Sequence, residues 1–372
     1  MTSDKTAIVL CLNAGSSSLK LAMFEMGEGR EVLLSQDSVE RIGLEGAPRD
    51  HAEALAAAFA RMGDREHRID VVGHRIVHGG PDHVAPARVD ADLLASLRAL
   101  LPLAPLHLPA AIAGIEAVTR RSPGLPQVAC FDTAFHSTLP EVARRLPLPP
   151  RFADHELRRY GFHGLSYEYV LSTLAPPLPE RIVVAHLGNG ASLAAVRGGR
   201  SIDTTMGLTP TGGILMGTRT GDLDPGVLLY LLREKGISPD ELEELVDKES
   251  GLVGVGGYSD MQTLLEKRSR DPRAALAVAM FGYSVRKAIG AMAAALGGLD
   301  LLVFTGGIGE HSTEVRKVAC EGLDVFGVGL DPERNARGEG VISSEKSRVV
   351  VRVVATNEDL MIARHARTLL AE

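Results

Sequence analysis

Two segments of the chain share the same pattern of an apolar stretch, a short polar turn and a second apolar stretch. The first reads IVLCLNAGSSSLKLAMF from Ile8 and the second reads IVVAHLGNGASLAAV from Ile182; Ser18 aligns with Ser192 at the same offset, without a gap. Each segment predicts a β-hairpin, because apolar runs bounded by turn residues are typical of strands. The repeat favours a duplicated fold, although two unrelated hairpins also look alike over so short a stretch.

The rest of the chain alternates strand-like and helix-like segments, which is typical of an α/β protein. A strand, a glycine turn and a helix begin at Asp300 (DLLVFTGGIGEHSTEVR), and a strand, a polar turn and a helix begin at Val349. Ligands of such folds usually bind at the carboxyl ends of the strands. The clearest break in composition is the proline-rich stretch LPLPPRF over 146–152, and we place a domain boundary there.

Composition excludes several classes of protein. The 372 residues carry a formal net charge of −7, so the basic surface that nucleic acids need is missing, and no lysine-rich run favours an anionic membrane. The apolar run near the N-terminus is too short for a signal peptide, and two charged residues interrupt the stretch 274–296, which predicts a buried helix. The 3 cysteines form no CxxC pair, so neither disulfides nor a zinc site are expected. We therefore expect a cytoplasmic protein that binds neither nucleic acid nor membranes.

The turn of the first hairpin carries more hydrogen-bond donors than a turn requires. Asn13, Ser16, Ser18 and Lys20 all fall within NAGSSSLK, and the glycine lets backbone N–H groups approach an anion closely. Neither GxxxxGK[ST] nor GxGxxG occurs, so a phosphate site here would be of another kind. From this segment alone, a phosphate loop and an ordinary polar turn both remain open.

Two arginines stand beside apolar or glycine-rich sequence. Arg75, in GHRIVHGG, follows an apolar strand, where a buried guanidinium needs an anionic partner. Arg219, in MGTRTGDLDPG, either binds an anionic ligand or pairs with Asp222 and Asp224. Because arginine binds carboxylates and phosphates through two hydrogen bonds, the two arginines together suit a substrate with a carboxylate and a phosphoryl group.

Carboxylates and histidines also stand at predicted strand ends. Asp132 (FDTAFH) and the pair Glu358 and Asp359 (TNEDL) are candidate Mg²⁺ ligands, although the pair also suits the cap of a helix. His163 (YGFHG) and His186 (AHLGNG) border glycines, so each is either a site residue or a structural one. No HExxH pattern occurs among the 12 histidines, which argues against a zinc hydrolase.

Ten segments, taken together and in order, resemble the acetate kinase family within the acetate and sugar kinase/Hsp70/actin superfamily. They run from about residue 8 to about residue 365: NAGSSSLK, GHRIVHGG, LAPLH, FDTAFH, YGFHG, HLGNGAS, SIDTTMGLTP, MGTRTGDLDPG, FTGGIGE and TNEDLMIAR. The resemblance implies reversible, ATP- and Mg²⁺-dependent phosphorylation of acetate to acetyl phosphate by direct in-line transfer. It also implies a homodimer and two duplicated RNase H-like (actin-like ATPase) domains around a central cleft. These domains would be 1–147 joined by the C-terminal helix 360–372, and 148–359, which would hold the nucleotide site and the dimer interface.

The resemblance also implies a role for each matched position. Arg75 and Arg219 would bind the carboxylate and the transferring phosphoryl group, with Asp132 at the reaction centre. His163, together with Arg219, would stabilise charge in the transition state. The implied ligands of Mg²⁺, or of Mn²⁺ in its place, are Asn13 and Glu358; the implied ATP-binding residues are Ser16, Ser18, Lys20, His186, Gly188, Asn189, Gly190, Asp260, Gly306, Gly307, Ile308 and Gly309; and the implied acyl pocket, beside Arg75, is Val77, Leu106, Phe162 and Pro210.

The chain departs from the family pattern at several positions. All the matched catalytic residues are retained, so kinase activity is still expected. The changes bear instead on the preferences for acyl chain and nucleotide. Leu108 stands in place of the usual Asn, Leu165 and Tyr167 in place of Thr and a second His, Gly212 in place of a Glu, and Gln262 in place of the Arg of an SSDxR segment.

Three other functions remain open. The first is a propionate or butyrate kinase, because one methylene in an apolar pocket changes discrimination by only about 1–3 kcal/mol; the NAGSSSLK loop favours acetate or propionate. The second is an actin-like or chaperone-like ATPase, which would share the topology but leave Arg75 without a role. The third is a nucleotide-binding protein without catalysis, against which the retained catalytic residues argue.

Overall fold

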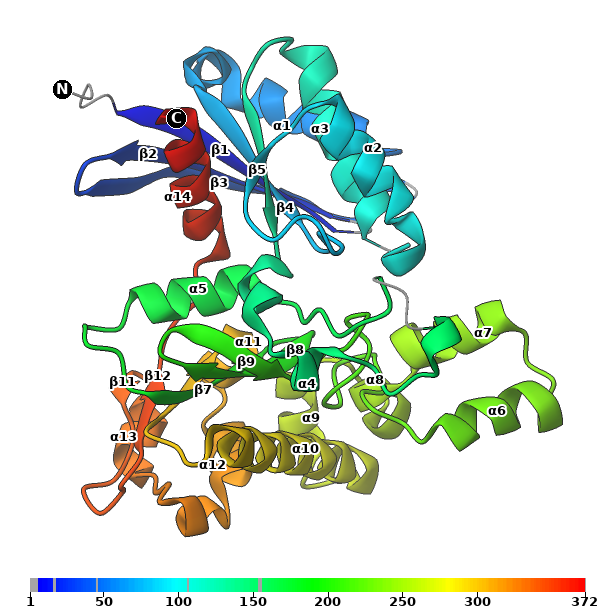
Figure 1. The fold of residues 1–372 in the computed structure, drawn as a ribbon, viewed down its shortest axis with the longest axis vertical. Coiled ribbons are helices and arrows are strands. Elements are labelled where there is room, and N and C mark those ends of the chain that lie inside the picture. The colour runs from blue at the N-terminus through cyan, green and yellow to red at the C-terminus, as the bar shows by residue number, and fades with distance from the viewer. Residues whose placement is uncertain (1–5, 16–17, 45, 106, 153–155, 372) are drawn as a thin grey trace. The chain divides into compact units, whose positions relative to one another are not determined.

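Each half of the chain builds one six-stranded sheet, and the two sheets belong to two separate units (Figure 1). The domain division expected at residue 147 stays a prediction. The structure, a computed structural model, describes residues 6–15, 18–44, 46–105, 107–152 and 156–371. Unit 1 comprises Met1–Phe135, Gly164–Tyr169 and Asn357–Glu372, and unit 2 comprises His136–His163 and Val170–Thr356.

The sheet of unit 1 begins with the hairpin that the sequence predicts. Strand β1 pairs antiparallel with β2 and parallel with β4, and β4 pairs parallel with β6. The turn is shorter than expected, because Asn13 pairs with Lys20 inside the β1–β2 ladder, so both belong to strands. The order is β3-β2-β1-β4-β6-β5, with bounds β1 Ala7–Ala14, β2 Leu19–Gly27, β3 Arg30–Val39, β4 Val71–Ile76, β5 Ala87–Arg88 and β6 Gln127–Phe131.

Side chains along β1 alternate between two cores, because successive residues of a strand point to opposite faces of the sheet. Ile8 and Leu10 belong to a buried cluster with residues of α1 and α3. Val9 and Cys11 belong to the cluster on the opposite face, where helix α14 packs. The helices within unit 1 are α1 His51–Met62, α2 Ala91–Ala99, α3 Leu108–Arg121 and α14 Glu358–Ala371, with 3₁₀ helices η1 Gly63–Arg68 and η2 Leu101–Leu103.

Helix α14 lies close to the sheet because β4 carries a glycine at the point of contact. A Cβ atom on Gly73 would lie 2.4 Å from Cγ2 of Ile362, which is closer than real Cβ contacts allow. Figure 1 shows this helix in red, packed against the blue strands of the sheet. The close approach places the first residue of the helix, Glu358, near the carboxyl ends of the parallel strands, as the contact between Glu358 and Arg75 at the end of β4 shows.

The sheet of unit 2 repeats the same plan. The second predicted hairpin is β7 paired antiparallel with β8, and β7 pairs parallel with β10, which pairs parallel with β12. This order of antiparallel and parallel neighbours is that of β1, β2, β4 and β6 in unit 1, so the expected duplicated α/β fold is confirmed. The order is β11-β12-β10-β7-β8-β9, with bounds β7 Arg181–Leu187, β8 Ala191–Arg197, β9 Arg200–Thr204, β10 Leu301–Thr305, β11 Gly340–Val341 and β12 Val350–Val353.

The longest helix of the described chain, α10, packs along the sheet of unit 2 through small and apolar side chains such as Ala277, Phe281 and Val285. It covers the stretch that the sequence predicts to be a buried helix. The other helices that lie in unit 2 or enter it are α4 Glu141–Arg144, α5 Gly164–Ser172, α6 Pro225–Glu234, α7 Pro239–Glu244, α8 Gly251–Gly256, α9 Met261–Lys267, α10 Pro272–Leu296, α11 Gly306–His311, α12 Thr313–Cys320 and α13 Pro332–Arg337, with short 3₁₀ or π turns η3 Ala134–Thr138, η4 Pro150–Phe152, η5 Leu245–Glu249 and η6 Leu323–Phe326.

Two further observations concern expectations drawn from composition. Among the described residues, no helix is both long enough and apolar enough to cross a membrane. Cys11, Cys130 and Cys320 are all buried and free, and burial raises the pKa of each thiol. These thiols therefore behave as small apolar core groups, not as reactive nucleophiles.

Candidate active site

A charged cluster in unit 1 lies where three parallel strands end. Asn13 is near the end of β1, Arg75 is near the end of β4, and Asp132 directly follows β6. Because carboxyl ends of parallel strands meet at one edge of a sheet, residues far apart in the chain come together here. Glu358 joins them from the first turn of α14.

Arg75 is the centre of this cluster. Its Nη2 donates to Oδ2 of Asp132 at 2.6 Å and its Nε donates to the same oxygen at 3.1 Å, while Nη1 donates to Oδ1 of Asn13 at 3.2 Å. Its Nε also lies 3.7 Å from Oε2 of Glu358. The Asp132 side chain is 1% exposed and that of Arg75 is 20% exposed, so the carboxylate is enclosed while the arginine side chain keeps some contact with solvent. This arrangement presents a fixed, oriented cation.

The cluster carries more negative than positive charge. Burial lowers the pKa of Arg75 by itself, but Asp132 and Glu358 outweigh burial and hold that pKa above its ordinary value. Burial raises the pKa of Asp359, the nearby charge of Glu358 raises it further, and Arg75 and Lys20 offset part of the increase. Three carboxylates therefore face two cations, which is an environment that favours an additional cation.

The oxygen atoms of this cluster suit Mg²⁺, an ion that takes few ligands from the protein, better than a metal ion that is held entirely by protein side chains. No group of three or more His, Cys, Asp or Glu in the described part of the chain forms a metal cage. Mg²⁺ typically takes only one or two carboxylates from a protein and completes its shell with waters and phosphate oxygens. The amide oxygen of Asn13 and the carboxylate of Glu358, both in contact with Arg75, are hard ligands of this kind.

The position of Asp132 depends on a glycine. The N–H of Gly164 donates to the carbonyl oxygen of Asp132 at 2.9 Å, and a Cβ on Gly164 would lie only 2.3 Å from that oxygen. A larger residue would therefore displace the backbone that carries the Asp132 carboxylate. This contact explains the glycine that follows the histidine in YGFHG.

His163 anchors a second set of polar residues, which belongs to unit 2. It has a φ of 61°, an unusual backbone conformation for a residue with a side chain, and such conformations are typical of functional sites. Its Nδ1 lies 2.8 Å from Oγ of Ser192, and its ring stacks on that of His186 with centroids 4.3 Å apart. The two histidines that the sequence singled out in this half therefore lie side by side.

His136 holds the turn before His163, and no sequence pattern marked it as a functional residue. Its Nε2 donates to the carbonyl oxygen of Phe162 at 3.1 Å, and its Nδ1 lies 2.8 Å from Oγ of Ser201. Burial lowers the pKa of His136 to about 4, so the ring is neutral at pH 7. A Cβ on Gly161 would lie 2.6 Å from the His136 ring, which explains why glycine is needed at that position. The only signal in the sequence was the final histidine of FDTAFH.

Arg219 lies on a loop that is fixed by the start of helix α8. The N–H of Leu252 donates to the carbonyl of Met216 at 2.8 Å, so a helix-terminal donor is satisfied by the loop. The side chain of Arg219 donates from Nη1 to the carbonyl of Pro210. A Cβ on Gly190 would lie 3.4 Å from that same Nη1 and 3.5 Å from Nε2 of His163, so the three residues are neighbours.

The two aspartates that the sequence offered as partners of Arg219 have other roles in this structure. Oδ1 of Asp222 accepts from the N–H of Gly213 at 2.7 Å, and this hydrogen bond joins the two ends of the loop that carries Arg219. Oδ1 of Asp224 accepts from the N–H of Gly226 and caps helix α6. Both aspartates therefore shape the loop that carries Arg219.

Apart from Ser16, Ser18 and Lys20, which belong to unit 1, the residues matched to the nucleotide lie in unit 2. Gly188 and Asn189 form the turn of the β7–β8 hairpin with Gly190, and the carbonyl of Asn189 accepts from the N–H of Gly217. Gly306, Gly307, Ile308 and Gly309 begin helix α11 at the end of β10. Asp260 instead caps helix α9, where its Oδ2 accepts from the backbone of Thr263, and Gln262 donates to Glu266.

The remaining matched residues are placed as follows. Ser16 and Leu106 lie outside the described residues. Ser18 directly precedes strand β2, and Lys20 is the second residue of that strand. Val77 follows β4 in unit 1, whereas Phe162 and Pro210 belong to unit 2. The positions that depart from the family pattern are buried at Leu108, Leu165 and Tyr167, partly buried at Gly212 and exposed at Gln262.

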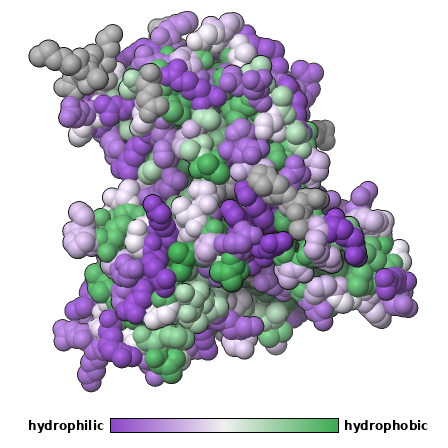
Figure 2. All heavy atoms as spheres, viewed as in Figure 1, coloured by the Kyte–Doolittle hydropathy of each residue, from purple (hydrophilic) through white to green (hydrophobic). Residues whose placement is uncertain are grey.

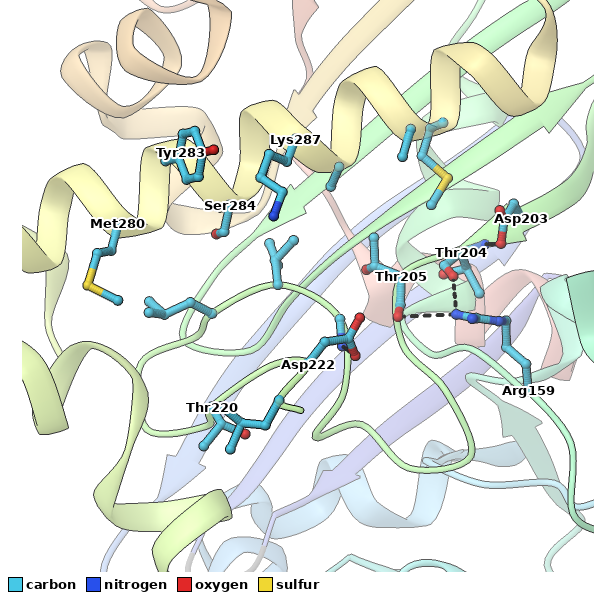
Figure 3. A pocket seen from close by; sticks show the side chains of 17 residues that line it. Arg159, Asp203, Thr204, Thr205, Thr220, Asp222, Met280, Tyr283, Ser284 and Lys287 are labelled. Atoms are coloured by element: carbon cyan, nitrogen blue, oxygen red, sulfur yellow. Dashed lines mark hydrogen bonds between the residues drawn. The ribbon is translucent and has the colours of Figure 1, made fainter. Parts of the chain in front are cut away.

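A cavity of about 530 Å³ lies beside the Arg219 loop within unit 2 (Figure 3). One wall is the loop segment with Thr220 and Asp222, and the other is α10, from which Ser284 and Lys287 point toward the loop. Arg159 closes one end by donating to the carbonyls of Thr204 and Thr205. Thr220 and Asp222 of the Arg219 loop thus face a cavity whose lining contains none of the residues matched to substrate or nucleotide.

Two units with one strand order, each with polar residues at the ends of its parallel strands, define the duplicated actin-like ATPase fold. Within this class, the chain belongs to the Acetokinase family, which its sequence matches over residues 8–364. An acetate kinase of Rhodopseudomonas palustris is 46% identical over 388 residues, covering 96% of this chain and 97% of the relative. The family resemblance inferred from the ten segments is confirmed.

Solved structures agree with this assignment. The crystal structure of Porphyromonas gingivalis acetate kinase matches with a TM-score of 0.89 and 39% identity, covering 98% of this chain and 100% of that one. A propionate kinase from Francisella tularensis matches with a TM-score of 0.92 and 36% identity, covering 97% and 99% of the two chains. The chain therefore shares the fold of these enzymes.

Proposed function

We propose that this protein is an acetate kinase, which transfers the γ-phosphoryl group of ATP to acetate and produces ADP and acetyl phosphate, reversibly. The observation that supports this most is the Arg75 cluster, in which the guanidinium of a partly exposed arginine is fixed by Asp132 and Asn13 at the ends of parallel strands. A fixed guanidinium is the group that a carboxylate substrate requires for orientation. The relatives named acetate kinase support the same activity.

In the proposed mechanism, the carboxylate of acetate is itself the nucleophile, so no strong general base is needed. Arg75 binds and orients this carboxylate, with Asp132 at the reaction centre fixing the guanidinium. His163 and Arg219 stabilise the charge on the transferring phosphoryl group. Positioning and charge stabilisation of this kind account for most of the catalysis in phosphoryl transfer. The stacked ring of His186 and the contact with Ser192 hold His163 in place.

Asn13 and Glu358 would hold Mg²⁺, or Mn²⁺ in its place. The excess of carboxylates around Arg75 supports this assignment. When bound, the ion supplies positive charge to the phosphate oxygens of the nucleotide. The proposed ATP-binding residues are Ser16, Ser18, Lys20, His186, Gly188, Asn189, Gly190, Asp260, Gly306, Gly307, Ile308 and Gly309.

The function is tested by ADP release from ATP and Mg²⁺, first without a carboxylate and then with acetate, propionate or butyrate. The acyl phosphate is trapped as its hydroxamate. We expect turnover that depends on acetate and gives the trapped product. ATP hydrolysis at the same rate with and without each acid would contradict the kinase assignment and favour an ATPase.

A propionate kinase is the second candidate, because an enzyme of that name has nearly the same fold. The proposed acyl pocket comprises Val77, Leu106, Phe162 and Pro210. An apolar pocket separates acids that differ by one methylene by only about 1–3 kcal/mol. The order of rates with acetate, propionate and butyrate in the same assay decides between the two, and a preference for propionate would contradict the first assignment.

We further propose that the protein is cytoplasmic and has two RNase H-like domains, 1–147 with 360–372 and 148–359. We propose that it forms a homodimer in which the two subunits contact each other through the domain 148–359. Leu276, Met280 and Tyr283 recur at helical spacing on α10 and are all exposed. Exposed apolar side chains recur on α6, and Figure 2 shows green, apolar areas on the part of unit 2 that holds α6 and α7. Exposed apolar side chains that repeat along one helix are typical of subunit interfaces.

Replacing Tyr283 by aspartate is expected to convert the dimer to a monomer, because a charge would be buried in the interface. The 92% exposed Val142 on α4 is the matched control, and Val142→Asp should leave the dimer intact. Sedimentation velocity measures the masses of both variants and of the wild type. A wild-type monomer, or a dimer that tolerates Tyr283→Asp, would argue against this interface.

A further inference from the structure

Glu310 makes a long-range bridge that the proposed mechanism does not use. It lies in helix α11, four residues after Gly306, and its Oε1 accepts from the N–H of Gly306 at 2.9 Å. The same oxygen accepts from the N–H of Thr356 at 3.0 Å, 46 residues further along the chain. One carboxylate oxygen therefore joins the glycine loop at the end of β10 to the segment that follows β12.

The second end of this bridge leads directly to the proposed metal ligand. Thr356 is the last residue of unit 2, and Glu358 follows two residues later as the first residue of α14. Just before the bridge, the N–H of Val354 donates to the carbonyl of Phe304 at 3.0 Å, so this segment continues alongside β10. Oδ1 of Asn357 then accepts from the N–H of Leu360 in the first turn of α14. The backbone between β12 and Glu358 is thus defined from both sides.

The other end of α11 is held by a buried arginine. Nη1 of Arg316 donates to the carbonyls of Gly309 and Glu310 at 2.9 and 2.8 Å, and its Nε donates to Oδ1 of Asn335 at 2.8 Å. The Arg316 residue is only 1% exposed, so the guanidinium is committed to these contacts. The glycine loop therefore has one fixed end at Arg316, and Glu310 is the contact that fixes its start.

We propose that Glu310 is a positioning residue whose carboxylate holds the Gly306–Gly309 loop and the segment leading to Glu358 in one geometry. This inference rests on the proposed function, because it takes the loop as part of the nucleotide site and Glu358 as a metal ligand. Loss of the bridge frees the start of the loop and the approach to Glu358 together. Affinity for ATP and the requirement for Mg²⁺ therefore depend on the same side chain.

Two conservative variants distinguish a bridging role of the Glu310 side chain from a role of its negative charge. Glu310→Gln keeps the length of the side chain and an oxygen that accepts from both N–H groups, but it removes the negative charge. Glu310→Asp keeps the charge, but it is one methylene too short to reach both donors. A bridge predicts that Gln replaces Glu better than Asp does, and a purely electrostatic role predicts the reverse order.

The measurements are the dissociation constant of ATP by titration calorimetry with excess Mg²⁺, and the Mg²⁺ concentration that gives half-maximal acetate-dependent rate. In Glu310→Asp we expect both to rise by about five-fold or more, since one hydrogen bond and a stranded donor are at stake. In Glu310→Gln both should stay within about two-fold of the wild type. The KM for acetate should change by less than about two-fold in either variant.

Thermal unfolding of both variants controls for a role in stability alone. An equal loss of melting temperature in the two variants, with ATP affinity unchanged in Glu310→Asp, would overturn the proposal. So would a Glu310→Gln variant that binds ATP as weakly as Glu310→Asp. Calorimetry needs no acetate, so these outcomes are distinct from failure of the proposed function, which a wild-type protein without acetate-dependent turnover would show.

Discussion

Replacement of Arg75 by alanine is expected to lower the turnover number with acetate by about a hundred- to a thousand-fold, the usual effect of removing one preorganised hydrogen-bond donor. The guanidinium is fixed by Asp132 and Asn13, and the Arg75 side chain is partly exposed, so its loss removes the group that orients the carboxylate. Steady-state rates with varied acetate and saturating ATP measure the effect. A rise in KM is expected because the arginine binds the carboxylate, and a fall in turnover number is expected because it also holds the carboxylate aligned for transfer.

Two variants accompany this measurement. Arg75→Lys keeps the positive charge beside the buried Asp132 but loses the paired hydrogen bonds, so we expect a folded protein with intermediate activity. Arg98→Ala removes a surface arginine paired with Glu116, and turnover should stay within about two-fold of the wild type. Normal turnover in a folded Arg75→Ala variant would remove Arg75 from the proposed mechanism.

The overall fold was predictable because its signals are local. Each hairpin is marked by apolar runs on both sides of a polar turn, and the shared spacing of Ile8 and Ile182 revealed the repeat. The boundaries were less well predicted. The polar sequence predicts a turn at Asn13, but this residue pairs with Lys20, because the antiparallel ladder continues to Ala14 and Leu19.

The residues of the charged cluster could be nominated from the sequence, but their partners could not. Arg75 and Asp132 are 57 residues apart, and only the parallel pairing of β4 with β6 brings their strand ends together. The sequence does not mark His136 and Glu310 for the same reason: each has a partner far along the chain, Ser201 at 65 residues and Thr356 at 46 residues. Local patterns carry no information about such contacts, which depend on topology.

Gly251 illustrates how a residue without a side chain positions a proposed catalytic one. It has a φ of 64°, and its backbone begins helix α8 beside the Arg219 loop. A Cβ atom there would lie 2.2 Å from the carbonyl oxygen of Met216 and 2.6 Å from that of Arg219. These are backbone atoms, so the contact is relieved only if the loop itself moves.

Gly251→Ala is therefore expected to destabilise the protein and to lower its activity, and Gly236→Ala is the matched control. Gly236 has nearly the same φ, 68°, but no atom lies within 4 Å of the position that a Cβ would take, so its substitution adds only the strain of a left-handed conformation, about 1–2 kcal/mol. Gly251→Ala adds steric overlap, which we expect to lower the free energy of unfolding by about 1–3 kcal/mol more. Displacement of Arg219 by about 1 Å should lower turnover by about a hundred-fold. Urea unfolding and steady-state rates compare the two variants, and equal results for both would show that the Arg219 loop does not depend on the glycine.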